Sequence, residues 1–162
     1  LDYITLLKNH IKKEVKKMKI IIVGGGETGL TLAKLFEKEM EVTLVEKDEI
    51  RAKELAQKTN ALVIHGDGTD ISILKEAEID KVDALVVATG DDTTNLMISQ
   101  IGKSEKVQKV VPLVRKPKNE ELFAKLGVST FVSAAGSNAS AIKRILRTYG
   151  DARIIAQFGE GD

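Results

Sequence analysis

A glycine-rich segment stands between an apolar run and a stretch of helical period. The segment GGGETG, residues 24–29, has the spacing G-x-G-x-x-G and directly follows the apolar run at 19–23. An apolar run without alternation is typical of a strand buried on both faces of a parallel sheet. In this context Gly24 is predicted to make a tight turn, Gly26 to let the backbone approach a pyrophosphate, and Gly29 to let a helix close on the strand. A loop that only reverses the chain is the alternative.

The rest of the chain repeats one order: a short β-branched run, a polar turn, then a longer segment of helical period. This alternation predicts βαβ units in an α/β, doubly wound, Rossmann-like fold. It would have a six-stranded parallel sheet in the order 3-2-1-4-5-6 with flanking helices, preceded by an amphipathic helix. Pro112 falls in the fifth strand without an N–H to donate, so we expect a bulge or a later strand start there. The expected strands are 19–23, 42–45, 61–64, 84–88, 110–114 and 128–132, and the expected helices are 28–38, 49–59, 70–77, 93–103, 119–127 and 137–148.

The composition excludes several classes of function. Lys and Arg (25) balance Asp and Glu (24), which leaves a formal charge of +1 and not the basic field of a dedicated nucleic-acid binder. The 162 residues fit one full domain, and the lack of cysteine is typical of a reduced, cytoplasmic protein. No apolar run in the sequence approaches the ~20 residues of a membrane-spanning helix.

Both ends of the chain differ from the repeat. Residues 1–17 carry an apolar stripe of Ile4, Leu7, Ile11 and Val15 among lysines, which predicts an amphipathic basic linker helix. Such a helix packs on its own domain, connects to a membrane segment or forms a dimer contact, and the sequence leaves these open. We assign 18–150 to a nucleotide-binding domain and 151–162 to the start of a truncated C-terminal segment, where 152–158 has the pattern of a strand.

Glu46 directly follows the second predicted strand, about twenty residues after the glycine segment. A carboxylate at this place hydrogen-bonds the adenosine ribose hydroxyls of a dinucleotide and repels a 2′-phosphate. Glu46 therefore favours NAD or an adenine nucleotide over NADP, although the neighbouring cations Lys47 and Arg51 weaken this preference. A solvated strand end is the alternative interpretation of Glu46.

Polar residues also follow the third and fourth predicted strands, at the edge where open α/β sheets bind ligands. Asp67 and Asp70 are candidates for the adenine side, and Thr89 and Gly90 for the second half of a dinucleotide. Turn formation and helix capping are their alternative roles. His65 is interpreted as a strand-end residue, and no motif indicates a dedicated metal site.

The sequence predicts a nucleotide-binding site but indicates no residues that would catalyse a reaction of the nucleotide. Hydride transfer needs a general acid or base and a pocket for a second substrate. The two tyrosines lie in the leading helix and after the last one, and the six strands with their helices leave no residues for a substrate domain. We therefore expect a binding domain that is not an enzyme. A trimmed NAD-dependent oxidoreductase and a scaffold with an empty cleft are the alternatives.

Over about residues 18–148 the sequence resembles a family, the RCK or KTN domain at the N-terminus of Trk potassium-uptake regulators. The glycine segment is shared with all dinucleotide folds, whereas GDGTD at 66–70 and ATGDDTTN at 88–95 are more particular to this family. The other matching segments are IIIVGGGETGL at 20–30, VEKD at 45–48 and LGVSTFVS at 126–133.

The resemblance implies a cytoplasmic sensor that binds NAD or NADH, or alternatively ATP or ADP. It implies a homodimer or larger ring that controls a membrane potassium channel or transporter through a dimer-hinge change, held at the inner face of the membrane by that partner. The glycines would take the pyrophosphate, Glu46 the ribose, and Asp67 the adenine side. Thr89, Gly90 and Asp91 would bind the second half of the dinucleotide, and Arg115 would be a basic residue that faces the cleft or the partner subunit. The candidate cofactor-binding residues are Gly24, Gly26, Glu27, Thr28, Gly29, Glu46, Lys47, Asp67, Thr89, Gly90, Asp91 and Arg115.

Three residues depart from the family's pattern. Glu46 stands where aspartate is common, which leaves ribose binding intact. Glu27 puts an acid beside the phosphate loop, which disfavours a highly charged triphosphate, and Pro112 interrupts the fifth strand, which changes the expected dimer surface.

Overall fold

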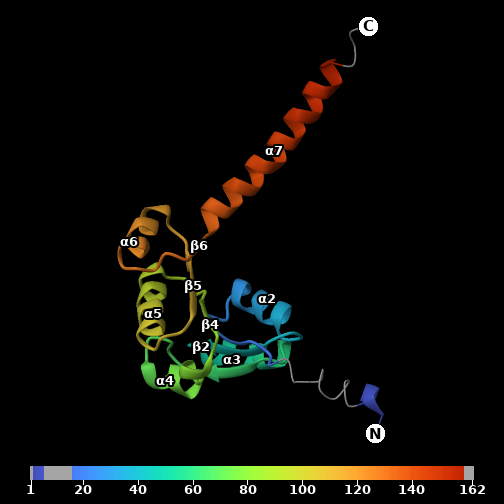
Figure 1. Cartoon of the computed structure of the whole chain (residues 1–162). Helices are drawn as coiled ribbons and strands as arrows, with labels where there is room; N and C mark the ends of the chain where they lie inside the picture. The colour runs from blue at the N-terminus through green and yellow to red at the C-terminus, as the bar shows by residue number, and fades with distance from the viewer. Residues whose placement is uncertain (1, 6–15, 159–162) are drawn as a thin grey trace.

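The computed structural model describes residues 2–5 and 16–158, and it shows a parallel sheet flanked by helices (Figure 1). The strands pair in the order β3-β2-β1-β4-β5-β6, and every pairing is parallel. This confirms the predicted doubly wound α/β fold. The strands are β1 (Lys19–Val23), β2 (Glu41–Glu46), β3 (Leu62–His65), β4 (Ala84–Val87), β5 (Lys109–Val114) and β6 (Val132–Ser133).

Aspartates fix where three of the helices begin. Asp48, Asp70 and Asp91 are the N-caps of α3, α4 and α5, and each carboxylate accepts a hydrogen bond from a backbone N–H two or three residues further on. The predicted caps Asp48 and Asp70 are thereby confirmed. The helices are α2 (Glu27–Phe36), α3 (Glu49–Lys58), α4 (Ile71–Glu76), α5 (Asp92–Ser104), α6 (Glu120–Lys125) and α7 (Ala134–Phe158), with 3-10 turns η1 (Ile79–Lys81) and η2 (Pro117–Asn119).

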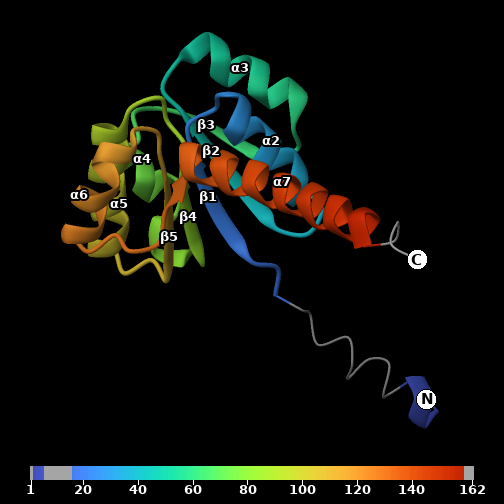
Figure 2. The same cartoon turned by 90° about the horizontal axis from the view of Figure 1, so that it is seen from above.

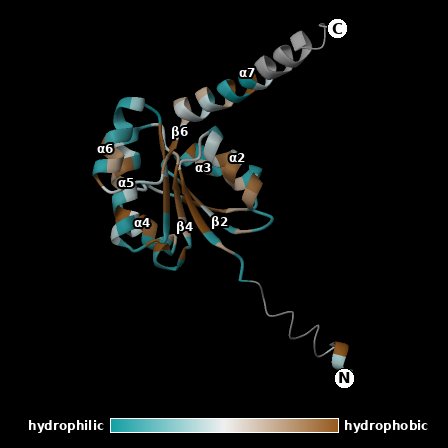
Figure 3. Cartoon of the chain, turned by 45° about the horizontal axis from the view of Figure 1, so that its top comes forward, coloured by the Kyte–Doolittle hydropathy of each residue, from teal (hydrophilic) through white to brown (hydrophobic). Residues whose placement is uncertain are grey.

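Successive residues of β1 pack into different halves of the core. Ile21 and Val23 pack with residues of α4 and α5, whereas Ile20 and Ile22 pack with residues of α2 and α3. Figure 3 shows the hydrophobic residues concentrated on the central strands. Burial on both faces explains why the β1 sequence has no polar alternation. It also fixes the end of β1, from which the glycine segment starts.

The β5–β6 edge of the sheet differs from the prediction. Pro112 lies inside a regular β5 and keeps its register with β4, without a bulge or a late start. β6 pairs with β5 only from Leu113 onward, so Pro112 has a strand on one side only, a setting that tolerates a missing N–H. β6 covers two residues and not the predicted 128–132, because Val128 turns into the core with its N–H on the carbonyl of Phe123.

The predicted strand at 152–158 is wrong, because α7 continues through these residues as one helix. No strand of the described residues pairs with this segment, whereas a helix satisfies its own backbone N–H and C=O groups. Both views show α7 extending from β6 past the body of the domain (Figures 1 and 2). Ile142, Ile145 and Leu146 of this helix are exposed.

The predicted basic helix at 1–17 falls largely on residues 6–15, which lie outside the described residues. Residues 3–5 are helical, but Lys16 and Lys17 have no regular structure, so the helix does not run up to the domain as predicted. The division of the chain at residues 17 and 150 stays a prediction. Among the described helices, none combines the length and the apolar character needed to cross a bilayer.

Candidate functional site

A cavity of about 560 Å³ opens beside the carboxyl ends of β1, β2, β3 and β4. It includes the boundary between β1 and β4, where the two halves of the sheet wind in opposite directions, and open α/β sheets bind their ligands at this point. Its volume is in the range of small-molecule sites. Nine of the predicted site residues line it: Gly24, Gly26, Glu46, Lys47, Asp67, Thr89, Gly90, Asp91 and Arg115.

The other three predicted residues lie outside the cavity lining. Glu27 and Thr28 form the exposed first turn of α2, and Gly29 is buried within the same helix. A Cβ on Gly29 would stand 1.8 Å from the carbonyl oxygen of Gly24. The packing of α2 on the loop therefore requires this glycine, whatever the cavity holds.

Gly24 and Gly26 are needed for different reasons. Gly24 has φ +106°, and a Cβ there would meet the carbonyl oxygen of Ala88 at 2.6 Å. Gly26 has an extended backbone, and a Cβ there would meet no atom within 4 Å. The fold thus accounts for Gly24, whereas Gly26 leaves open space at the cavity. Gly26 is also the N-cap of α2 without a capping side chain, so this helix start is suited to an anion.

Glu46 joins the end of β2 to the glycine loop. Its Oε2 accepts a hydrogen bond from the N–H of Gly25 at 2.7 Å, and its Oε1 accepts one from the N–H of Asp48 at 2.8 Å. Arg51 of α3 donates from Nε to the carbonyl oxygen of Gly25 at 2.8 Å. Sequence spacing predicts Glu46 near a ribose but does not reveal these contacts, which hold the loop against β2 and α3.

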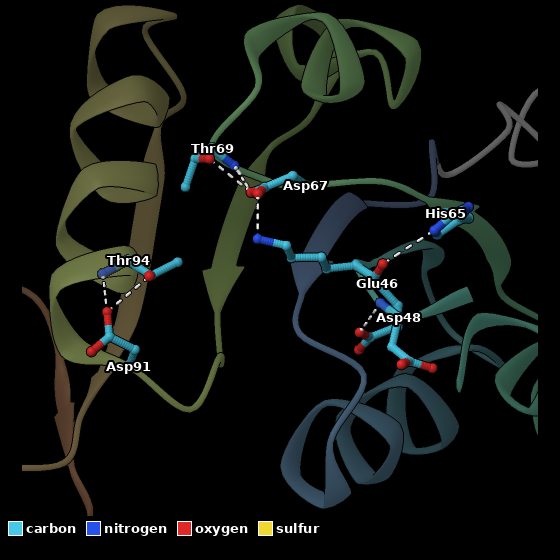
Figure 4. Close-up of polar contacts among 8 residues, drawn as sticks. Glu46, Asp48, His65, Asp67, Thr69, Asp91 and Thr94 are labelled. Carbon is cyan, nitrogen blue, oxygen red and sulfur yellow. Dashed lines mark hydrogen bonds and ion pairs between the residues drawn. The ribbon is translucent and has the colours of Figure 1, made fainter. Parts of the chain in front are cut away.

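Lys47 and Asp67 connect β2 to the turn after β3. The Lys47 Nζ lies 2.8 Å from Asp67 Oδ2, and Asp67 Oδ1 accepts hydrogen bonds from the N–H and the hydroxyl of Thr69 (Figure 4). The hydrogen bond from Lys47 and then those from Thr69 lower the pKa of Asp67 to about 2. This side of the cavity therefore carries an ionised carboxylate with its partners already in place.

Buried Asn95 of α5 holds the turn after β4. Its Oδ1 accepts from the backbone N–H of Thr89 at 3.1 Å, and its Nδ2 donates to the carbonyl of Leu113 in β5 at 3.0 Å. Asp91 in the same turn accepts from the N–H of Thr94 at 2.7 Å, and this hydrogen bond lowers the pKa of Asp91 (Figure 4). The far side of the cavity is thus fixed to both α5 and β5.

Arg115 reaches the cavity from the end of β5. Its Nε donates to the carbonyl of Thr89 at 3.3 Å, and its backbone N–H donates to the buried Asp92 at 2.8 Å. Asp92 also accepts from the N–H of Lys116 and from Nδ2 of Asn119. Burial raises the pKa of Asp92, but these hydrogen bonds outweigh burial and leave the pKa below its ordinary value. Asp92 therefore fixes the backbone that carries Arg115.

Asp70 and His65 lie outside the cavity lining. Asp70 caps α4, which is the alternative role that the sequence left open for it, and His65 ends β3 with its Nε2 3.1 Å from the carbonyl of Lys47. Within residues 2–5 and 16–158, no group of three or more His, Asp or Glu side chains is arranged to hold a metal ion.

Sequence reasoning missed several residues of the lining. The GDGTD turn could have indicated three of them, because it follows β3 directly at the carboxyl edge of the sheet. Thr94 and Ile98 carry no such indication, since they reach the cavity only through the helical turns of α5. The missed polar and glycine residues and Ile98 are Gly25, Gly66, Gly68, Thr69, Thr94 and Ile98.

The chain is similar in sequence to proteins of potassium uptake systems. The TrkA-N domain family matches residues 20–134. A Trk system potassium uptake protein TrkA homolog from Methanothermobacter thermautotrophicus is 36% identical over 146 residues, which cover 90% of this chain and 67% of the relative. A Trk system potassium uptake protein trkA homolog 1 from Methanosarcina mazei is 32% identical over 132 residues, 80% of this chain and 32% of the relative. The chain thus spans about two thirds of one relative and about one third of the other.

Solved structures share the fold. The GsuK RCK domain has a TM-score of 0.69 at 23% identity and covers 93% of this chain and 32% of that chain. The GsuK channel bound to NAD has a TM-score of 0.61 at 17% identity, with coverage of 80% and 25%. The Kef CTD of Shewanella denitrificans in AMP bound form has a TM-score of 0.66 at 18% identity, with 87% of each chain covered. With most of its length matched by the family and a relative 36% identical, this chain belongs to the TrkA-N domain family.

Proposed function

We propose that this domain binds an adenine nucleotide, NAD or NADH with ATP or ADP as the alternative, and that binding regulates a potassium channel or transporter. One observation carries the proposal: the cavity beside β1 and β4 combines open space at Gly26, a helix start without a capping side chain, and Glu46 at the end of β2. These features support the binding of the phosphates and the ribose of one nucleotide.

The phosphates would lie at the start of α2 beside Gly26, where N–H groups and the helix dipole attract an anion. Glu46 would bind the ribose. A carboxylate offers about four acceptor sites, and the contacts with Gly25 and Asp48 use one on each oxygen. The remaining sites suit the 2′- and 3′-hydroxyls, and the negative charge of Glu46 disfavours the 2′-phosphate of NADP.

The two sides of the cavity suit the two halves of a dinucleotide. Lys47 and Asp67 would face the adenine side, while Thr89, Gly90 and Asp91 would face the second half, with Arg115 supplying a positive charge there. NAD would occupy both sides, whereas ADP would leave the second side open. The NAD of the GsuK channel and the AMP of the Kef structure support an adenine nucleotide as the ligand class.

The potassium uptake systems named for the relatives support the regulatory role. We propose a homodimer or larger ring, held at the cytoplasmic face of the membrane by a channel or transporter subunit. The exposed apolar residues Ile142, Ile145 and Leu146 of α7 offer a surface for a second copy. A nucleotide would change the hinge between two domains only by its difference in affinity for the two hinge states. Sedimentation velocity tests the assembly, and a monomer at high concentration would contradict the hinge.

An oxidoreductase is the alternative function. Against it stands the described lining of the cavity, which includes no histidine or tyrosine to act as the usual acid or base. Incubating the chain with NADH and a panel of small carbonyl compounds separates the two functions. Oxidation of NADH above the rate without protein would show an enzyme and contradict the regulatory domain.

Calorimetric titration of the full chain with NAD, NADH, ATP, ADP, AMP and NADP tests the proposal directly. We expect binding of at least one of the first four and at least tenfold weaker binding of NADP than of NAD. Gly26→Val should abolish binding, whereas Gly136→Val should not, because Gly136 lies in the first turn of α7 and a Cβ there meets only the Ser133 side chain. Lack of binding by every nucleotide would leave a scaffold with an empty cleft.

A further inference from the structure

The backbone of Gly25 is held by side chains at both of its polar groups. Its N–H donates to Oε2 of Glu46 at 2.7 Å, and its carbonyl oxygen accepts from Nε of Arg51 at 2.8 Å. Gly25 is buried, and a Cβ there would overlap Leu55 of α3, so the loop lies tightly against that helix. Two long side chains, those of Glu46 and Arg51, therefore fix the orientation of the backbone at this one glycine.

The contact with Arg51 determines where the next N–H points. The carbonyl of Gly25 and the N–H of Gly26 belong to one peptide unit, and the described chain contains no cis peptide bonds. In a trans peptide the C=O and N–H bonds point in opposite directions. Because the carbonyl points to Arg51, which lies outside the cavity lining, the N–H of Gly26 points away from Arg51. Gly26 itself is exposed and lines the cavity.

We propose that Arg51 is a positioning residue for the phosphate site. By holding the carbonyl of Gly25 on the α3 side of the loop, Arg51 sets the N–H of Gly26 to donate a hydrogen bond to a phosphate of the bound nucleotide. This inference rests on the proposed nucleotide-binding function and adds a residue outside the cavity lining. Arg51 orients a hydrogen-bond donor of the loop and does not itself contact the ligand.

The surroundings of Arg51 fit this role. Its Nη1 pairs with Glu54 at 3.0 Å, and its backbone N–H donates to the capping carboxylate of Asp48, so one contact holds the side chain and the other holds the backbone that carries it. The planar guanidinium then presents Nε–H in one direction, which the ammonium of lysine does not reproduce. Lys53, two residues along α3, offers a contrast, because it is exposed and, among the described residues, pairs only with Glu49 on the surface of the same helix.

The test compares Arg51→Met, Arg51→Lys and the control Lys53→Met in the full chain. ADP binding is measured by calorimetry, and adenosine binding by titration of backbone amide signals in NMR spectra. We expect both Arg51 variants to bind ADP at least tenfold more weakly and to bind adenosine within twofold of the unmutated chain. ADP should shift the Gly26 amide proton strongly in the unmutated chain and in Lys53→Met, but not in the Arg51 variants.

Each result has one interpretation. Normal ADP binding by Arg51→Lys would show that only the charge matters, and equal loss of ADP and adenosine would show a merely structural role, so either result overturns the inference. If the unmutated chain binds ADP and both variants bind it equally well, this inference fails while the proposed function stands. If the unmutated chain binds no nucleotide, the proposed function itself fails.

Discussion

Alanine at Gly29 and alanine at Gly26 separate what the fold needs from what a ligand needs. In Gly29→Ala the new Cβ would stand 1.8 Å from the Gly24 carbonyl oxygen, so loop and helix must separate by about 1 Å or more. Overpacking of this kind costs about 1–3 kcal/mol, and the better helix propensity of alanine offsets only about 0.5–1 kcal/mol. Because the clash is with backbone, we expect a net loss near 2 kcal/mol and a Tm lower by about 4–8 °C.

Gly26→Ala should behave in the opposite way. Its Cβ meets no atom within 4 Å, so the fold has room for it. Alanine is a poorer N-cap than glycine by about 0.5–1 kcal/mol, but it also lowers the entropy of the unfolded chain by a similar amount. The free energy of unfolding should therefore stay within about 0.5 kcal/mol of the unmutated chain. Nucleotide affinity should fall at least tenfold, about 1.4 kcal/mol, because the methyl group stands where phosphates approach.

Urea unfolding and calorimetric titration of the same preparations measure both quantities. We expect Gly29→Ala to be less stable than the unmutated chain, and Gly26→Ala to be as stable as the unmutated chain but defective in nucleotide binding. If Gly26→Ala unfolds as readily as Gly29→Ala, the open space at Gly26 is not real. If it binds nucleotide like the unmutated chain, the ligand does not approach the loop at this residue.

Three further predictions concern polar residues that line the cavity or hold the segments around it. The folded-state pKa of Asp67 is about 2, against an ordinary value of 3.8. The ionised carboxylate of Asp67 therefore contributes stability above about pH 4, and this contribution is lost as the pH falls toward 2. Urea unfolding between pH 7 and 2 should show this loss of stability, and the loss should be smaller in Asp67→Asn. Asn95→Ala leaves the N–H of Thr89 without its acceptor and should lower the free energy of unfolding by about 2–3 kcal/mol, with a loss under about 1 kcal/mol contradicting the buried network. Asp92→Ala removes a buried acceptor of three hydrogen bonds and should lower the free energy of unfolding, measured with denaturant, by a similar amount. Asp91→Ala removes an exposed helix cap and should lower it by only about 1 kcal/mol.

The parts of the fold that depend on near neighbours in the chain were predictable. The apolar run of β1 and the caps Asp48 and Asp70 could be identified from the sequence. Burial on both faces and helix capping each determine which residue types occur within a few consecutive positions. The conformation at Pro112 depends on how far β6 extends beside it, and the helix at 152–158 depends on the absence of a pairing strand in the described sheet. Neither the conformation at Pro112 nor the helix at 152–158 can therefore be predicted from the neighbouring residues in the sequence.

The candidate site follows the same division. Glu46 and Asp67 could be placed at the cavity because residues that follow parallel strands meet at one edge of the sheet. The contacts that organise the cavity join distant segments: Arg51 to Gly25, and Asn95 to β5. Side chains of this kind look like ordinary helix residues in the sequence, and only the packed structure shows what they hold.

α7 is long, and it is attached directly to the edge of the sheet. At a rise of about 1.5 Å per residue, its 25 residues span roughly 37 Å. The helix starts immediately after β6, which pairs with β5, the strand directly before Arg115. A rotation of only about 10° at that junction would carry the far end of the helix through about 6 Å, about one helical pitch. A rotation at the junction too small to disturb the core would thus become, at the far end of α7, a displacement large enough to exchange one set of contacts for another.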